Sequence, residues 1–134
     1  MDSKKSIKKT KRVSKKPVIS REYIKIDAEG KAIGRLAVEI AKSLMGKTKP
    51  TFQYHVDNGD FVMVANLTKV KFTGKKYDQK EYYHHSGYPG GLKTTLLKQI
   101  FSKNPEKILH DAVWNMLPKN KLRAQMIKRL KISK

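Results

Sequence analysis

Two short stretches of the chain carry hydrophobic patterns that predict β-strands. In residues 22–28, EYIKIDA, Ile24 and Ile26 alternate with Tyr, Lys and Asp, which is the two-residue period of a strand with one buried face. Residues 61–66, FVMVAN, form a nearly continuous apolar run, which is typical of a strand covered on both sides by helices. Residues 69–85 resemble two further strands joined by a turn around Gly74.

Apolar residues at helical spacing predict helices between and after these strands. Asn104 is suited to an N-cap and Pro105 to the first helical position, so one helix has a clear start. The last predicted helix is highly basic. The order of the elements indicates an α/β domain. The predicted helices cover residues 33–46, 94–101, 104–118 and 119–131.

Composition adds a strong positive charge to this domain. The 134 residues contain 31 Lys and Arg against 11 Asp and Glu, a formal net charge of +20. A lone domain gains nothing from such self-repulsion, so we expect a polyanionic partner, and nucleic acid before anionic membrane. No apolar stretch approaches the roughly 20 residues of a membrane helix, so a membrane partner is not expected. The absence of Cys excludes disulfides and thiolate chemistry.

The charge is concentrated at the two ends of the chain. Residues 1–21 hold nine Lys or Arg and one Asp, and residues 119–134 hold seven Lys or Arg and no acid. Residues 22–118 hold fifteen basic and ten acidic residues. The chain therefore divides into an N-terminal tail, expected to be disordered until it meets counter-charge, an α/β core, and a basic C-terminal helix and end. A solubilising extension is the alternative interpretation of the tail.

Two turns resemble ligand sites weakly. Residues 27–35, DAEGKAIGR, join a strand to a helix through two glycines, a setting that can hold phosphate, but they lack the P-loop and dinucleotide patterns. A tight turn with a surface Arg35 is the alternative. Residues 54–60, YHVDNGD, offer carboxylates for a hard cation. We favour a turn before a strand there, with Asx side chains bonding nearby backbone.

The most distinctive stretch is residues 82–91, YYHHSGYPGG. His84 and His85 are adjacent, so they point to opposite faces of a strand and do not share a metal easily. Acid–base catalysis has only Glu81 close by. Tyrosine and histidine rings can instead stack on RNA bases, while glycines let the backbone approach phosphate. A surface strand and loop with no ligand remains the alternative. We expect no catalytic residues, no metal site and no cofactor.

Five motifs in order carry a resemblance to a known family: DAEGKAIGRLAVEIAKSLMGK, HVDNGDFVMVAN, KVKFTGKK, YYHHSGYPGGLK and MLPKNKL. Together they make the chain, from about Tyr23 to Ile132, similar to the bacterial-type ribosomal protein thirteen family of the large subunit. The chain departs from the family pattern where Arg123-Ala124 replaces Gly-Arg and where Trp114-Asn115 replaces a small residue or glycine before Met116.

The resemblance implies a three-layer α/β/α domain with a mostly parallel or mixed sheet of about four strands, plus basic terminal extensions. It also implies binding to large-subunit rRNA beside neighbouring ribosomal proteins, an early role in assembly and no catalysis. We expect a monomer within the ribosome, in a bacterial-type cytoplasm rather than an organelle. The alternatives are a basic accessory protein on DNA or mRNA, and a metal- or nucleotide-dependent hydrolase.

The predicted RNA-binding residues combine basic side chains with the tyrosine-histidine-glycine segment. They are Lys4, Lys5, Lys8, Lys9, Lys11, Arg12, Lys15, Lys16, Arg35, Lys47, Lys49, Lys76, Tyr82, Tyr83, His84, His85, Ser86, Gly87, Gly90, Gly91, Lys93, Lys119, Lys121, Arg123, Lys128, Arg129 and Lys131.

Overall fold

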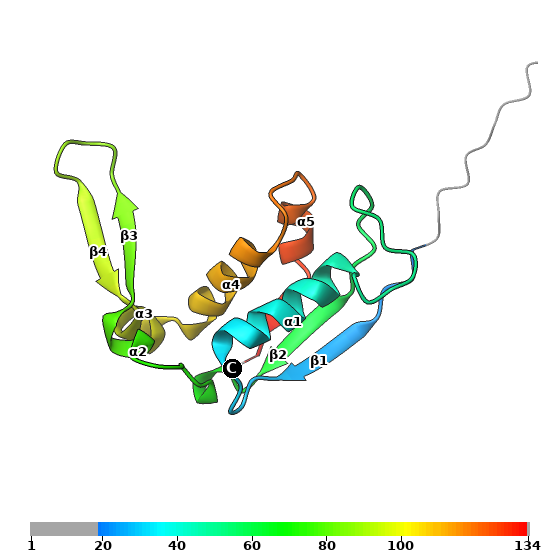
Figure 1. Ribbon diagram of the computed structural model, residues 1–134, viewed down its shortest axis with the longest axis horizontal. Helices are drawn as coiled ribbons and strands as arrows, with labels where there is room; N and C mark the ends of the chain where they lie inside the picture. Colours follow the sequence, from blue (N-terminus) through cyan, green and yellow to red (C-terminus); the bar gives the residue numbers. More distant parts are fainter. Residues whose placement is uncertain (1–18, 134) are drawn as a thin grey trace, which may run out of the picture.

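The computed structural model describes residues 19–133, and the center of this region is a small parallel β-sheet (Figure 1). Its strands are β1 (Tyr23–Asp27), β2 (Phe61–Ala65) and β5 (Leu130–Ile132), in the order β1-β2-β5. Both strand pairs are parallel, with Tyr23 opposite Phe61 and Val62 opposite Leu130. The first two strands confirm the predictions for residues 22–28 and 61–66.

Two helices supply most of the packing against this sheet. Helix α1 (Ile33–Met45) follows β1 and ends at Gly46, whose φ of 74° is the left-handed conformation that glycine adopts most readily. Helix α4 (Pro105–Met116) packs on α1. Asn104 caps α4 as predicted, because its side chain accepts a hydrogen bond from the Lys107 N–H.

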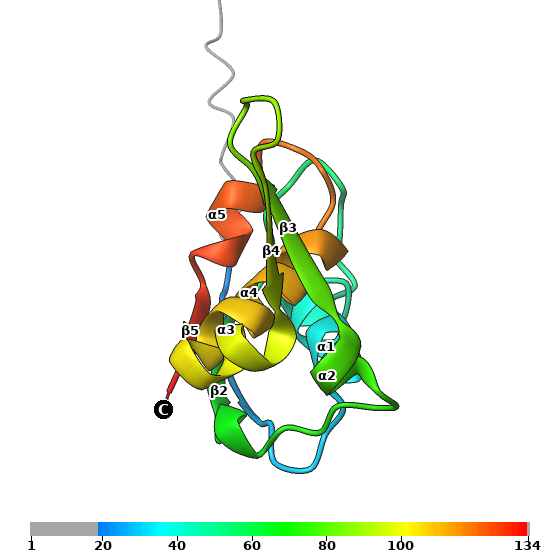
Figure 2. The ribbon, with the colours of Figure 1, turned by 90° about the vertical axis from the view of Figure 1, so that its left-hand side faces the viewer.

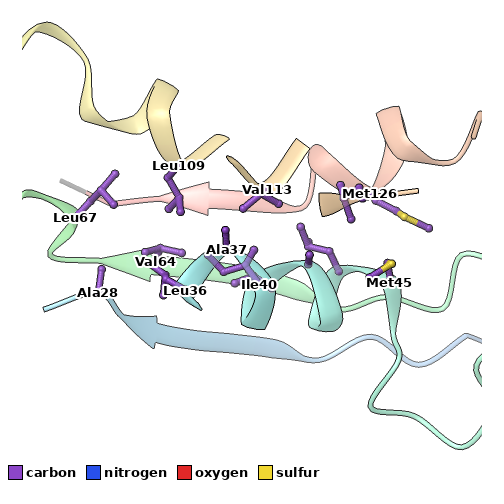
Figure 3. Close-up of a cluster of buried hydrophobic side chains, with 14 of the residues drawn as sticks. Ala28, Leu36, Ala37, Ile40, Met45, Val64, Leu67, Leu109, Val113 and Met126 are labelled. Atoms are coloured by element: carbon purple, nitrogen blue, oxygen red, sulfur yellow. The ribbon is translucent and has the colours of Figure 1, made fainter. Parts of the chain in front are cut away.

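The hydrophobic core lies between the sheet and these helices. Leu36 and Ile40 from α1, Val64 from β2, and Leu109 and Val113 from α4 are all fully buried there. Figure 3 shows these side chains converging on one space. Full burial of one such aliphatic side chain contributes roughly 1.5–3 kcal/mol, so this cluster is the main support of the fold.

The α/β class with a parallel sheet is confirmed, but the layers differ from the expectation. The parallel sheet has three strands rather than about four. Val62 and Val64 are buried while Met63 and Ala65 on the opposite face are exposed, so within residues 19–133 helices cover one face of the sheet. The apolar run at 61–66 therefore does not mark a strand covered on both sides. The β1–β2 and β2–β5 connections cross the sheet in the same direction. Right-handed crossovers in one direction place their helices, here α1 and α4, on the same face.

A second, two-stranded antiparallel sheet stands apart from the first. It is formed by β3 (Glu81–His85) and β4 (Leu92–Leu96) and is flanked by α2 (Lys76–Gln79) and α3 (Leu97–Lys103). The predicted turn at Gly74 is present, with φ of 64°. The predicted first strand before it is wrong, because that segment holds the 3₁₀ helix η1 (Leu67–Lys69) and a single bridge from Lys71 to Ala32.

Two predicted helices are shorter than expected. Residues 94–96 extend as the end of β4, so the helix predicted at 94–101 begins at Leu97. The basic helix predicted at 119–131 is reduced to α5 (Arg123–Ile127), and Leu130–Ile132 form β5 because they pair with β2 at the sheet edge. The tail predictions for residues 1–18, and Lys134, lie outside the described residues. None of the helices formed by residues 19–133 has the length and apolar character needed to cross a membrane.

Candidate nucleic-acid interface

Residues 81–96 form a hairpin that projects from the body of the protein, and we call it the hairpin arm (Figures 1 and 2). Its exposed ring and apolar side chains include Tyr83, 65% exposed, Tyr88, 76% exposed, and Leu92. Such side chains on a thin two-stranded arm gain little from the fold itself. These side chains are available to a partner. Tyr88 belongs to this group, but the predicted RNA-binding set omits it. Its position between Gly87 and Gly90 in the same motif is the sequence feature from which its exposure could have been predicted.

The loop at the tip of the hairpin arm depends on its glycines. Gly87 and Gly90 have φ of 89° and 73°, which favour glycine. A Cβ on Gly91 would lie 2.0 Å from Ser86 Oγ, so a side chain there would force the loop open. The Ser86 N–H donates to the Gly91 carbonyl at 3.1 Å and closes the turn. The tip is therefore a compact loop whose backbone another molecule can approach closely.

The adjacent histidines are separated as the sequence predicts. His84 lies directly across from Lys93 on β4, while the Nδ1 atom of His85 accepts a hydrogen bond of 3.0 Å from the Gly87 N–H. Consecutive residues of a strand face opposite sides of the sheet. No group of three or more His, Cys, Asp or Glu residues among positions 19–133 could hold a metal ion.

The two tyrosines of β3 also differ in their surroundings. Tyr82 is half-buried, and burial, with a smaller effect from Asp111, raises its pKa above the ordinary value of 10.0. The Lys80 ammonium lies 5.2 Å from the center of the Tyr82 ring. Tyr83 is exposed and its hydroxyl donates a 2.7 Å hydrogen bond to the Glu81 carboxylate, which raises its pKa. Tyr82 faces the body, and Tyr83 faces solvent.

Most of the predicted basic residues in the described region are exposed, and they come from several elements. Arg35 lies in the first turn of α1, and the others lie on α2, β4, β5 and the connections between elements. The exposed members of the set are Arg35, Lys47, Lys76, Lys93, Lys119, Lys121, Lys128 and Lys131. They do not converge on one small site, which suits a long polyanion better than a small anion.

Three of the connections project to the same side of the molecule. The tip of the hairpin arm, the connection between α4 and α5, and the segment between α1 and β2 all point upward in Figures 1 and 2. The α4–α5 connection includes Lys119 and Lys121, and the α1–β2 segment includes Lys47. This side of the protein is therefore uneven and basic rather than flat.

Two residues of the predicted RNA-binding set are part of the internal structure. Arg129 is only 4% exposed, and its guanidinium donates to both carboxylate oxygens of Asp57, at 2.5 and 2.6 Å. It also donates to the Leu44 carbonyl at 2.9 Å. The Lys49 ammonium lies 2.5 Å from the mostly buried Asp60 carboxylate. Because these charges are already paired inside the protein, Arg129 and Lys49 have a role in the fold, and their contact with RNA stays a prediction.

Arg123 is also turned toward the protein. Its guanidinium lies over the Trp114 ring, 4.1 Å from the ring center, and donates to the Trp114 carbonyl. His110 stacks near the same ring at 6.4 Å. A half-buried arginine held in this way offers a phosphate only part of its hydrogen-bonding capacity.

The strand–helix turn at 27–35 is held by backbone hydrogen bonds to residues 69–71. The N–H groups of Gly30 and Ile33 donate to the carbonyls of Lys69 and Lys71. The Asp27 carboxylate accepts from the Glu29 N–H and from Asn66, which lowers the pKa of Asp27. These donors are used within the fold, so the turn interpretation is favoured over a phosphate loop.

The segment 54–60 is a loop before β2, as predicted, but its acidic side chains bind distant partners rather than nearby backbone. Asp57 pairs with Arg129 and Arg21, and Asp60 accepts from the Glu22 N–H at 2.9 Å. Gly59 is required there, because a Cβ would lie 1.7 Å from the Leu44 carbonyl oxygen. This loop therefore links the start of β1, the end of α1 and the residues that follow α5.

Comparison with known proteins places this fold in a family. The family described as Ribosomal protein L13 matches residues 21–134. The chain is 54% identical over 114 residues to the large ribosomal subunit protein uL13 of Thermotoga maritima, covering 85% of this chain and 76% of the relative. It is 51% identical over 120 residues to uL13 of Clostridioides difficile, covering 90% and 84%. The chain therefore belongs to the ribosomal protein L13 family.

Proposed function

We propose that this protein is a structural constituent of the large ribosomal subunit that binds large-subunit rRNA and has no catalytic role. The hairpin arm meets the RNA with its rings and glycine loop, while the exposed lysines on the same side neutralise phosphates. The names of the 51–54% identical relatives support the assignment to the large subunit. The surface chemistry supports rRNA as the direct partner.

One observation carries the proposal: the hairpin arm has exposed rings and a lysine that pack on little of the protein itself. Lys93 lies across from His84, so a charge and a ring that can stack share one face of the arm. Base stacking and phosphate contact are the two means by which proteins hold RNA without reading its sequence. An isolated two-stranded hairpin is only marginally stable in water, so binding RNA would also order it.

Co-sedimentation tests the proposal directly. Tagged protein expressed in a bacterial host should migrate with large subunits in a sucrose gradient at low salt, and purified protein should bind protein-free large-subunit rRNA. Migration with free mRNA or DNA, with no enrichment in subunits, would contradict it and favour the accessory-protein alternative.

A second experiment addresses assembly and neighbours. In stepwise reconstitution of large subunits, the protein should bind rRNA before most other subunit proteins, and its omission should delay later ones. Crosslinking within the finished subunit should join it to neighbouring ribosomal proteins as a single copy. Its addition last, without effect on the particle formed, would contradict an early role in assembly.

A further inference from the structure

A groove of about 660 Å³ lies at the base of the hairpin arm, between α1, α2 and α4. Its apolar walls include Ile33 and Phe72, and the exposed Met116 lies at its edge. Three lysines of the α2 region, Lys75, Lys76 and Lys80, also line it. The volume falls in the range of roughly 300–1,000 Å³ that is usual for sites holding small organic groups.

Gly34 is the unusual residue in this groove. It lies in the first turn of α1, a Cβ on it would meet no atom within 4 Å, and its φ is not in the left-handed region. Neither the backbone nor the packing of the described chain therefore requires glycine there. A glycine inside a helix costs about 0.5–1 kcal/mol relative to alanine. Because Gly34 has no side chain, the groove stays open beside α1 and another molecule can enter it.

The chemistry of the lining describes that occupant. Phe72 and the half-buried Tyr82 provide aromatic surface, and Gln79 and Asn115 carry amides that both donate and accept hydrogen bonds. A nucleobase needs apolar walls for its faces and amides for its edge, while an aliphatic side chain would leave the amides unused. The lysines suit a phosphate attached to that base. Among the described residues that line the groove, none is acidic.

We propose that this groove receives one unstacked nucleotide of the rRNA, with its base between α1 and α4 and its phosphate beside Lys75, Lys76 and Lys80. This inference rests on the proposed function, since it names one nucleotide of the same RNA partner. It adds a second point of attachment at the base of the hairpin arm, beyond the contacts at its tip. An acidic peptide of a neighbouring protein would match the lysines, but it lacks the flat ring that suits the aromatic and apolar walls.

Ultraviolet crosslinking of the full chain to protein-free large-subunit rRNA tests the groove. Trypsin cleaves after Lys107 and Lys119, so the peptide 108–119 carries Asn115 and Met116 from the groove, and the peptide 81–93 carries the tip of the hairpin arm. The wild-type chain should crosslink to RNA through both peptides, with the groove crosslink mapping to Asn115 or Met116. Because Tyr82 in the peptide 81–93 also lines the groove, crosslinks confined to residues 83–91 would overturn the groove proposal and leave the proposed function standing. Crosslinks in neither peptide would contradict both.

The variant Gly34→Leu fills the groove without changing any charge. It should lose the crosslink in 108–119, keep those at residues 83–91, and weaken rRNA binding by about 5- to 150-fold, the range for loss of one stacked base. The matched control Val38→Leu adds bulk at an exposed position of α1 outside the groove and should leave both crosslinks and affinity unchanged.

A second variant keeps the test decisive if Gly34→Leu unfolds, as judged by circular dichroism. Asn115→Asp places a negative charge at the exposed mouth of the groove and should also reduce the 108–119 crosslink. Full crosslinking and affinity in the folded variants would overturn the proposal. In assembled large subunits, a groove crosslink that forms only to another subunit protein would also overturn the proposal and assign the site to a peptide.

Discussion

The Arg123 guanidinium lies 4.1 Å from the center of the Trp114 ring and donates a hydrogen bond to the Trp114 carbonyl. Trp114 belongs to α4 and Arg123 to the start of α5, so this contact joins the two ends of the α4–α5 connection. We infer that the ring and the cation stabilise this connection together.

A double-mutant cycle measures this pair. Trp114→Ala and Arg123→Ala should each lower the free energy of unfolding, and the coupling between them should be about 0.5–2 kcal/mol, the strength of a partly desolvated cation–π contact. Urea denaturation followed by circular dichroism gives the four values. The same cycle with the exposed Lys121 in place of Arg123 is the control and should show no coupling. Fully additive effects of the first pair would contradict a stabilising contact between Trp114 and Arg123.

Arg129 and its neighbour Lys128 should separate stability from RNA binding. Arg129→Gln breaks a buried pair with Asp57 and should cost about 3–5 kcal/mol of unfolding free energy. Lys128→Gln removes an exposed charge, so it should change stability by less than about 0.5 kcal/mol and weaken rRNA binding slightly. Denaturant titration and a filter-binding assay measure the two effects. If Arg129→Gln were as stable as wild type, the assignment of this arginine to the internal structure would be wrong.

Tyr88 should matter for RNA and hardly at all for folding. It is among the most exposed large side chains described, so Tyr88→Ala should alter stability by less than about 0.5 kcal/mol. Loss of one stacking ring should weaken rRNA binding by about 1–3 kcal/mol. Tyr23→Ala is the binding control, because Tyr23 is 67% exposed but lies on β1, outside the hairpin arm and the connections beside it. Equal losses of affinity in both variants would remove the special role of the hairpin arm.

The hydrogen bond from Tyr83 to Glu81 makes a prediction about pH. Because the neutral phenol donates this bond, the folded state raises the pKa of Tyr83 above 10.0. The bond therefore stabilises the fold below that pH, and its contribution is lost as the pH rises through the folded-state pKa. Glu81→Gln should lower the pKa of Tyr83 toward 10.0, measured by nuclear magnetic resonance of the ring carbon beside the hydroxyl. An unchanged pKa would show that the carboxylate is not the cause, and the pKa of Tyr82 serves as an internal control.

Local signals in the sequence predict much of the fold. The alternation around Ile24 and Ile26, the Gly46 stop of α1 and the Asn104-Pro105 start of α4 each act over a few residues, and each is present in the structure. The separation of His84 and His85 follows from the geometry of a strand and was predictable for the same reason.

Features that depend on distant partners could not be read in this way. Leu130 continues the helical spacing of Leu122 and Met126, yet it belongs to β5 because β2, almost 70 positions earlier, offers a sheet edge. In the sequence, Arg129 looks like one more basic residue of the C-terminal end. Its partner Asp57 lies 72 positions earlier, and only folding brings the two together. The groove around Gly34 likewise joins three separate elements, so no short motif reveals it.

The salt dependence of rRNA binding tests the central claim most directly. If the exposed basic residues of this L13-family protein hold rRNA by neutralising phosphates, the logarithm of the binding constant should fall linearly with the logarithm of salt concentration. For about ten phosphates on duplex-like RNA the slope should be roughly −9, and removing residues 1–21 should make it less steep. A slope near zero would contradict the account, since affinity would then not come from the charge that dominates this sequence.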